Sequence, residues 1–272
     1  MTISTRDQLI NALANNNSRV LFDKASLANA VAGQFFSLWQ ATGQPGAGAT
    51  PATAAIPDNT TTGAVQFTQQ TAPATSYLAW MRAFTGNANQ TVEVHDRVAH
   101  MGGLSGDVTT AQSANIDVST LGLAAARRGA ANYSDLMWWI EVYTALGATG
   151  VNATVNVTYD DGSTGNLAAI ALGATPRAGR LYPLISAVAG RFIRGVNTVT
   201  LSATTGTAGN FGITCTRQRS AVDVDVAFKG VAYDWAQLGL PEVPNGACLA
   251  FVVPCITTTT GSVRGLAKLA HG

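Results

Sequence analysis

Alternating apolar and polar residues dominate the chain after residue 64. Between residues 151 and 159 every second side chain is apolar, and Asn or Thr fills the positions between. A strict period of two over this length predicts a half-buried strand of an antiparallel sheet. Asp160-Asp161-Gly162-Ser163 follows and supplies a hairpin turn, since glycine tolerates the positive φ that such turns need. We therefore expect a hairpin that returns over residues 165–172.

Further short strands follow the same rule. Residues 136–144 carry bulky side chains on both faces, with Trp138 and Ile140 on one and Trp139 and Tyr143 on the other, which is typical of a central strand. Strands are also predicted over residues 76–84, 92–101, 180–185, 196–203, 211–216, 222–228 and 248–256. Turn residues separate them at intervals of roughly ten positions, and this spacing favours a β-sandwich or a barrel. The order of the strands stays open at this point.

The first 63 residues are different and are predicted to form an arm ahead of a β domain over residues 64–272. Thr5 can cap a helix that begins at Arg6 and is ended by the asparagines at 15–17. A second helical stretch is predicted over residues 26–40, where apolar side chains recur at steps of three and four.

Residues 43–57 are rich in Gly, Pro, Ala and Thr and contain little bulk. Such a segment forms no core of its own, so we expect an extended linker or a strap over another surface, with a flexible spacer as the alternative. The large rings of Phe35, Phe36 and Trp39 argue against a free spacer. We therefore predict that the arm docks on a partner protein through these three side chains.

The small share of charged residues changes how the surface is interpreted. Charged residues make up 11% of the chain, whereas about 25% is usual in soluble domains. This deficit suits a protein whose surface becomes covered by neighbours, and Arg, which is common at interfaces, outnumbers Lys. The alternatives are a monomer kept soluble by Thr and Asn, and a GC-rich genome that favours Arg. A net charge of +1 predicts no long-range attraction to nucleic acid or to an anionic membrane.

Cysteine usage and hydropathy place further limits. Cys215, Cys248 and Cys255 fit neither a disulfide framework nor a zinc motif, so buried free thiols are expected. The N-terminal residues show no basic segment followed by an apolar run, and no segment is long and apolar enough to span a bilayer. The sequence thus predicts synthesis in a cytoplasm without export by the usual signal.

Candidate reaction chemistry is sparse around the histidines. His95 and His100 lie five residues apart, which places them on opposite faces of one strand and argues against a shared metal. His100, Ser105 and Asp107 can be written as a catalytic triad, but only their residue types support that grouping. Between the histidines, Asp96 and Arg97 are predicted to form a structural ion pair or an interface contact.

Two further polar features have simple interpretations. Asp223 and Asp225 alternate with valines and are expected on the solvated face of a sheet, with cation binding as the alternative. His271 is expected in a mobile C-terminal tail. We therefore predict no enzyme activity, no catalytic residue, no metal and no cofactor.

Several stretches of the chain resemble structural proteins of tailed bacteriophages. The first is His95-Asp-Arg-Val-Ala-His-Met-Gly-Gly-Leu-Ser-Gly-Asp-Val-Thr-Thr-Ala-Gln112, with an Asp-Arg pair, a histidine and a Gly-Leu-Ser-Gly turn ahead of Thr-Thr-Ala-Gln. The others are residues 140–149, 155–165, 178–184 and 196–212. The resemblance covers about residues 76–216 and leaves the arm out.

The resemblance implies a non-enzymatic capsid cement (decoration) protein, a class that includes jelly-roll folds. Such a protein is made in the host cytoplasm, binds the major capsid protein on the virion surface and clamps neighbouring subunits. Together with the strand pattern, it predicts a mainly β fold: an antiparallel β-sandwich of jelly-roll type with an N-terminal helical and extended arm. Self-association is also expected, and the predicted interaction residues are Phe35, Phe36, Trp39, Asp96 and Arg97. The alternatives are a tail, nozzle or fibre component and a host-surface carbohydrate-binding or hydrolytic β-sandwich.

Overall fold

A computed structural model describes residues 3–272. The chain is mainly β, with 46% in strands and 7% in helices, and its strands pair in antiparallel ladders. It divides into two compact units: unit 1 contains residues 3–48, 58–96 and 219–272, and unit 2 contains residues 49–57 and 97–218. The chain passes between the units after residues 48 and 57, and again within two long strands, β5 (Gln90–Leu104) and β13 (Asn210–Val224). Residue 63, the predicted boundary, lies inside unit 1.

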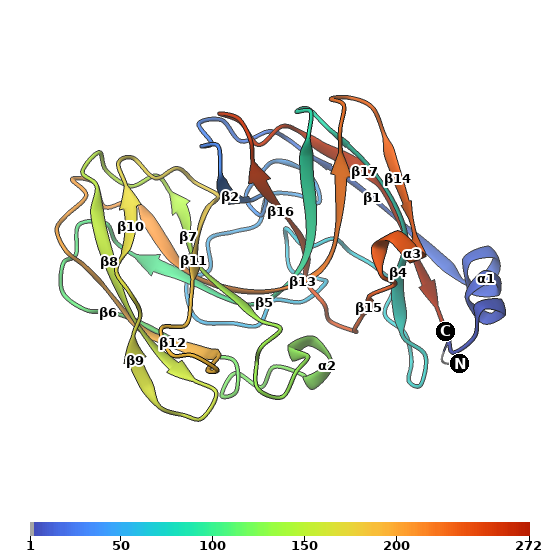
Figure 1. Cartoon of the computed structure of the whole chain (residues 1–272), viewed down its shortest axis with the longest axis horizontal. Coiled ribbons are helices and arrows are strands. Elements are labelled where there is room, and N and C mark those ends of the chain that lie inside the picture. The colour runs from blue at the N-terminus through green and yellow to red at the C-terminus, as the bar shows by residue number, and fades with distance from the viewer. Residues whose placement is uncertain (1–2) are drawn as a thin grey trace. The chain divides into compact units, whose positions relative to one another are not determined.

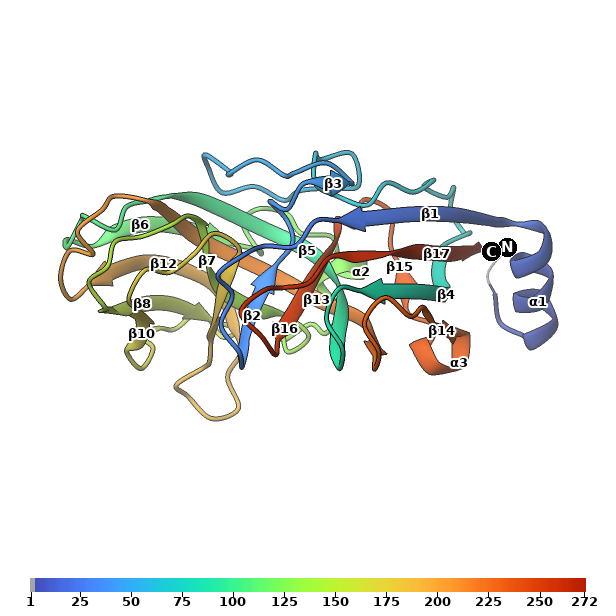
Figure 2. The same cartoon turned by 90° about the horizontal axis from the view of Figure 1, so that it is seen from above.

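The larger sheet of unit 1 joins strands from both ends of the chain. Its order is β14 (Val231–Asp234), β4 (Ser76–Thr85), β17 (Val263–His271), β1 (Asn17–Lys24) and β3 (Gly43–Gln44), and β15 (Glu242–Val243) also pairs with β4. Figures 1 and 2 show the blue β1 and the red β17 side by side, and they pair from one end to the other. Residues 17–24 are therefore part of this sheet and do not form a separate arm.

A second ladder of unit 1 is centred on β16 (Leu249–Cys255). It pairs with β2 (Gln34–Ser37) on one side and with the first part of β5 on the other. Apolar side chains from this ladder and from the larger sheet share one core, in which the ring centroids of Phe22 and Phe251 are 4.6 Å apart.

The first predicted helix is confirmed as α1 (Arg6–Asn15). The Thr5 hydroxyl accepts a hydrogen bond from the Gln8 N–H, and the Gln8 side chain accepts one from the Thr5 N–H. This reciprocal capping box satisfies two of the donors that a helix start leaves free. Leu9 of this helix is buried against the sheet. The short helix α3 (Trp235–Leu238), also in unit 1, follows β14.

The second predicted helix, over residues 26–40, is wrong. This segment contains turns and β2, and Phe36 of β2 lies opposite Val253 of β16. The adjacent apolar residues Phe35 and Phe36 fit a helix or a strand in so short a run. Pairing with β16, far away in the sequence, selected the strand.

Residues 43–57 form an ordered strap, one of the alternatives that the sequence predicted. The Gly48 N–H donates to the Trp39 carbonyl at 2.8 Å, and Ala55 exchanges two main-chain hydrogen bonds of 3.0 Å with His100. Glycine is required at position 48, because a Cβ there would lie 2.1 Å from Cε2 of Trp39.

Unit 2 contains the predicted hairpin. β8 (Val151–Tyr159) turns into β9 (Thr164–Asn166), and its valines point into the core, as the alternation predicted. The sheet order is β10 (Ile170–Gly173), β8, β12 (Ile193–Leu201) and β6 (Gln112–Asp117).

The other ladder of unit 2 has β7 (Met137–Thr144) at its centre. It lies between β11 (Arg180–Leu184) and the first part of β13, so the predicted central strand is confirmed. The Trp138 indole N–H donates to the Ile193 carbonyl at 2.8 Å, and helix α2 (Ala125–Arg128) precedes β7.

Two further parts of the sequence prediction need correction, and one stays a prediction. The strands expected over 211–216 and 222–228 are largely one continuous strand, β13. The expected C-terminal tail is β17, so His271 is buried and not mobile. The ladders support an antiparallel β fold without establishing the jelly-roll order.

Candidate functional site

The aromatic side chains predicted to dock on a partner lie in unit 1. Phe36 and Trp39 are 0% and 1% exposed, because β2 is paired within the unit and the strap crosses the Trp39 ring. Docking through these two rings is therefore contradicted, since unit 1 would have to open to release them. Phe35 is half-buried, and its contact with a partner stays a prediction.

Asp96 lies at the end of the unit 1 part of β5 and is fully buried. Its Oδ2 accepts a hydrogen bond from Arg219 Nη2 at 3.0 Å, and its Oδ1 accepts one from the Cys248 N–H at 2.9 Å. Neighbouring residues of a strand point to opposite faces, so Asp96 and Arg97 have different ionic partners. The predicted structural role of Asp96 holds, but its salt-bridge partner is Arg219.

Arg97 lies in a buried polar cluster of unit 2 with Glu141, Tyr143, Thr214 and His100. Its Nη2 lies 2.6 Å from Glu141 Oε2, and it donates to the hydroxyls of Tyr143 at 2.6 Å and Thr214 at 3.0 Å. Its Nε donates to His100 Nδ1 at 2.9 Å. The Thr214 hydroxyl donates in turn to the Glu141 carboxylate. One guanidinium thus links β5, β7 and β13, and it is 1% exposed, so the predicted surface contact for Arg97 is contradicted.

Burial shifts the pKa values of two side chains around Arg97. It lowers the pKa of His100 to about 2, and the positive charge of Arg97 acts in the same direction. A neutral imidazole is what the geometry requires, because Nδ1 accepts the hydrogen bond from Arg97. Burial also raises the pKa of Tyr143 above its usual value. This arrangement is suited to holding strands together.

The triad written from residue types does not assemble. His100 Nδ1 is occupied by Arg97, and Ser105 Oγ accepts a hydrogen bond from the Asp107 N–H at 3.3 Å within its turn. The Gln112 side chain closes the same turn, because it accepts from the Ser105 N–H at 2.7 Å and donates to the Ser105 carbonyl at 2.9 Å. The Gly-Leu-Ser-Gly turn and the glutamine that ends the phage-like stretch therefore form one structural element.

The side chain of His271, near the C-terminus, contacts two serine side chains, and sequence reasoning missed these contacts. His271 Nδ1 lies 2.9 Å from Ser76 Oγ, and its Nε2 lies 3.0 Å from Ser18 Oγ. His271 is 195 and 253 positions away from these two serines in the sequence, so no local signal could have grouped them. Elsewhere, the prediction of buried free thiols is confirmed for the three cysteines.

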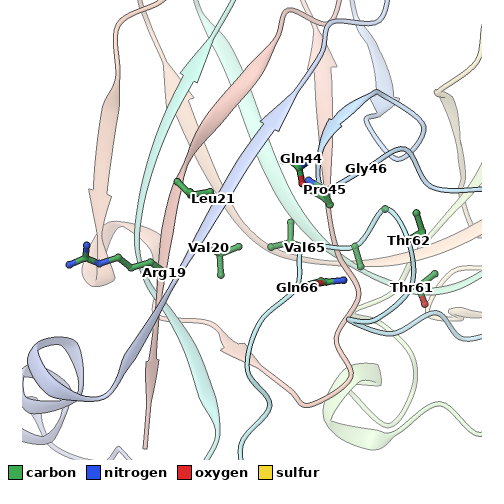
Figure 3. A pocket seen from close by; sticks show the side chains of 12 residues that line it. Arg19, Val20, Leu21, Gln44, Pro45, Gly46, Thr61, Thr62, Val65 and Gln66 are labelled. Carbon is green, nitrogen blue, oxygen red and sulfur yellow. The ribbon is translucent and has the colours of Figure 1, made fainter.

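A surface groove of about 310 Å³ lies beside β1 in unit 1. One wall is formed by Arg19, Val20 and Leu21 of β1, and the other by residues 61–66, with residues 44–46 at one end. In Figure 3 the side chains of Arg19 and Leu21 point away from the groove, whereas Val20 and Val65 point into the space between the walls. The main chain of β1 therefore faces the groove, a feature that sequence alone could not reveal.

Metal-binding clusters and membrane-spanning helices are absent from residues 3–272. No group of three or more His, Cys, Asp or Glu side chains in this range is placed to hold a metal ion. Of the helices in the same range, none has the length and hydropathy needed to cross a bilayer.

No protein-family model and no curated protein matches the chain. Solved structures with some similarity include the infectious bursal disease virus VP2 subviral particle, which is 12% identical over 94% of this chain and 79% of that chain, with a TM-score of 0.17. The Gx strain of the same virus is 11% identical over 93% and 79%, with a TM-score of 0.18. The Gt strain is 9% identical over 99% and 85%, with a TM-score of 0.17. These TM-scores are too low to establish a shared fold.

Proposed function

We propose that this protein is a non-enzymatic structural component of a virion, a cement protein that binds neighbouring capsid subunits on the outer shell. The observation that carries the proposal is how the fold uses residues 95–112, the stretch that resembles tailed-phage structural proteins. Three consecutive side chains of this stretch, His95, Asp96 and Arg97, are buried. Their polar partners are Glu93, Arg219 and Glu141, respectively. Side chains used in this way support a rigid scaffold more than a reacting site.

The composition supports a surface that is covered in the assembled particle. A charged fraction of 11% leaves few groups that must stay hydrated. A standard interface buries about 1,200–2,000 Å² in total, and repetition over a shell multiplies modest contacts by avidity. The partners proposed on this basis are the major capsid protein and further copies of this chain.

The copy number in purified particles tests this proposal. Quantitative mass spectrometry of virions from the source should find on the order of hundreds of copies, because a shell protein follows the shell symmetry. About a dozen copies or fewer would favour a tail, nozzle or fibre component and overturn the cement role. Absence from particles, with binding on a glycan array or turnover in a hydrolase screen, would favour a carbohydrate-directed protein.

A further inference from the structure

Among residues 3–272, only β3 pairs with the edge of β1 that faces the groove, and it covers one end of that edge. β17 pairs with β1 at every position from 17 to 24, whereas β3 pairs only with Asp23 and Lys24. Alternate residues of a strand turn their N–H and C=O groups to alternate neighbours, so Arg19 and Leu21 face the same side as Asp23. β3 ends at Gln44, before it reaches them. Within the part of the chain that the structure describes, the main-chain groups of Arg19 and Leu21 on this side have no partner strand and can pair with an added one.

The groove next to this edge has the character of a strand-binding site. Thr61, Thr62 and Gln66 line the far wall, and the carbonyls of Pro45 and Gly46 at its end already accept hydrogen bonds from the Lys24 ammonium. An extended chain needs partners for its own N–H and C=O groups, which a strand edge supplies, whereas a helix satisfies them internally. Leu21 beside the edge is 74% exposed, which leaves an apolar surface for a neighbouring side chain.

Charge selects among the chains that could add to this edge. Arg19 is the only charged residue that lines the groove, and it makes no ion pair within the described residues. A strand added to β1 places one side chain opposite Arg19 on the same face of the sheet, where an opposite charge stabilises and a like charge destabilises. A second copy that used the whole free edge, residues 17–21, in antiparallel register would set Arg19 against its own equivalent. The edge therefore disfavours self-pairing and favours an acidic partner.

We propose that the groove binds an extended segment of a partner protein as an added strand on β1. The segment carries a carboxylate opposite Arg19 and an apolar side chain beside Leu21. The proposal deepens the cement role, and its identification of the partner as a capsid subunit rests on that role. The chemistry of the segment rests only on the groove.

Two blocked peptides test the chemistry: acetyl-Val-Thr-Asp-Thr-Val-amide, which places Val beside Leu21 when Asp lies opposite Arg19, and its counterpart with Lys in place of Asp. The sequence reads the same in both directions, so a parallel or an antiparallel strand brings the central residue to Arg19. The Asp peptide should bind about fivefold tighter than the Lys peptide. It should also slow amide hydrogen exchange at Arg19 and Leu21. Arg19→Glu should reverse the preference, and Arg6→Glu, an exposed change on α1 away from the groove, should leave it unchanged.

Several results would overturn the proposal. These are equal binding of both peptides, unchanged exchange at the two amides, or no binding up to about 1 mM. A dimer in sedimentation that protects the same two amides would assign the edge to a second copy. If the wild-type chain is absent from particles, the cement role fails whatever the peptides do. If it is present and the peptides fail, only this inference fails.

Discussion

Arg97 Nη2 lies 2.6 Å from Glu141 Oε2 at a position where neither side chain is more than 2% exposed. Removal of one partner leaves a buried charge without compensation, which typically costs about 3–5 kcal/mol. We therefore expect Arg97→Met or Glu141→Leu to lower the free energy of unfolding by that amount in urea titrations. The double variant should recover part of the loss, since no isolated charge remains.

The control for this pair is Arg264→Met at the surface. Arg264 Nη2 lies 2.7 Å from Asp23 Oδ2, but the two side chains are 69% and 45% exposed. Exposed pairs contribute about 0–1 kcal/mol, so this change should be nearly neutral. Equal losses for Arg264→Met and Arg97→Met would contradict the structural role of the buried cluster.

His100 should make the protein sensitive to acid. Its pKa is about 2 in the folded chain and near 6.5 when unfolded. Between these values the unfolded chain binds a proton that the folded chain does not, so stability falls as the pH drops below about 6.5. Between pH 7 and about pH 4, the free energy of unfolding should fall more in the wild type than in His100→Gln, by up to about 3 kcal/mol. Denaturant titrations at each pH measure this difference. Parallel pH profiles of the two proteins would contradict this expectation.

Lys24 should make the free energy of unfolding depend on pH in the alkaline range. Burial lowers the pKa of its ammonium from 10.5 to about 8. The unfolded chain therefore holds the extra proton between pH 8 and 10.5, and stability rises with pH across that window, by up to about 3 kcal/mol. Lys24→Met lacks the titrating group, so the difference in unfolding free energy between the two proteins should change over this range. A constant difference would show that the amine is not buried as described.

Gly48 should not tolerate a side chain. A Cβ at this position would lie 2.1 Å from the Trp39 ring, so Gly48→Ala must displace the strap or the indole, at about 1–3 kcal/mol. Gly46→Ala in the same strap is the matched control, because a Cβ at position 46 would meet no atom within 4 Å. Thermal unfolding should separate the two variants, and a similar Tm would refute the close crossing.

Deletion of residues 1–60 should unfold unit 1 and not simply remove a docking arm. The deletion takes away β1, which lies between β17 and β3, and β2, which pairs with β16. The deletion also removes Phe22 and Phe36 from the core, which leaves Met81, Phe251 and Val253 exposed. Circular dichroism and limited proteolysis should show loss of folded structure. A truncated protein that stays folded would restore the interpretation of residues 1–63 as an arm.

The sequence by itself determined the features whose signals are local. The period of two in residues 151–159 and the Asp-Asp-Gly-Ser turn specified the β8–β9 hairpin, and Thr5 with Gln8 specified the start of α1. In both cases neighbouring residues supply the whole physical cause, a two-residue repeat or a reciprocal cap.

Only the tertiary structure decided the features that depend on distant partners. Phe36 became a strand residue because β16, more than 200 positions away, supplied its ladder. Arg97 met Glu141 and not its neighbour Asp96, because adjacent strand residues point to opposite faces. The free edge of β1 exists because β3 ends after pairing with only Asp23 and Lys24. The side-chain types were visible in the sequence, but long-range pairing set which of them are buried and which edge is left open.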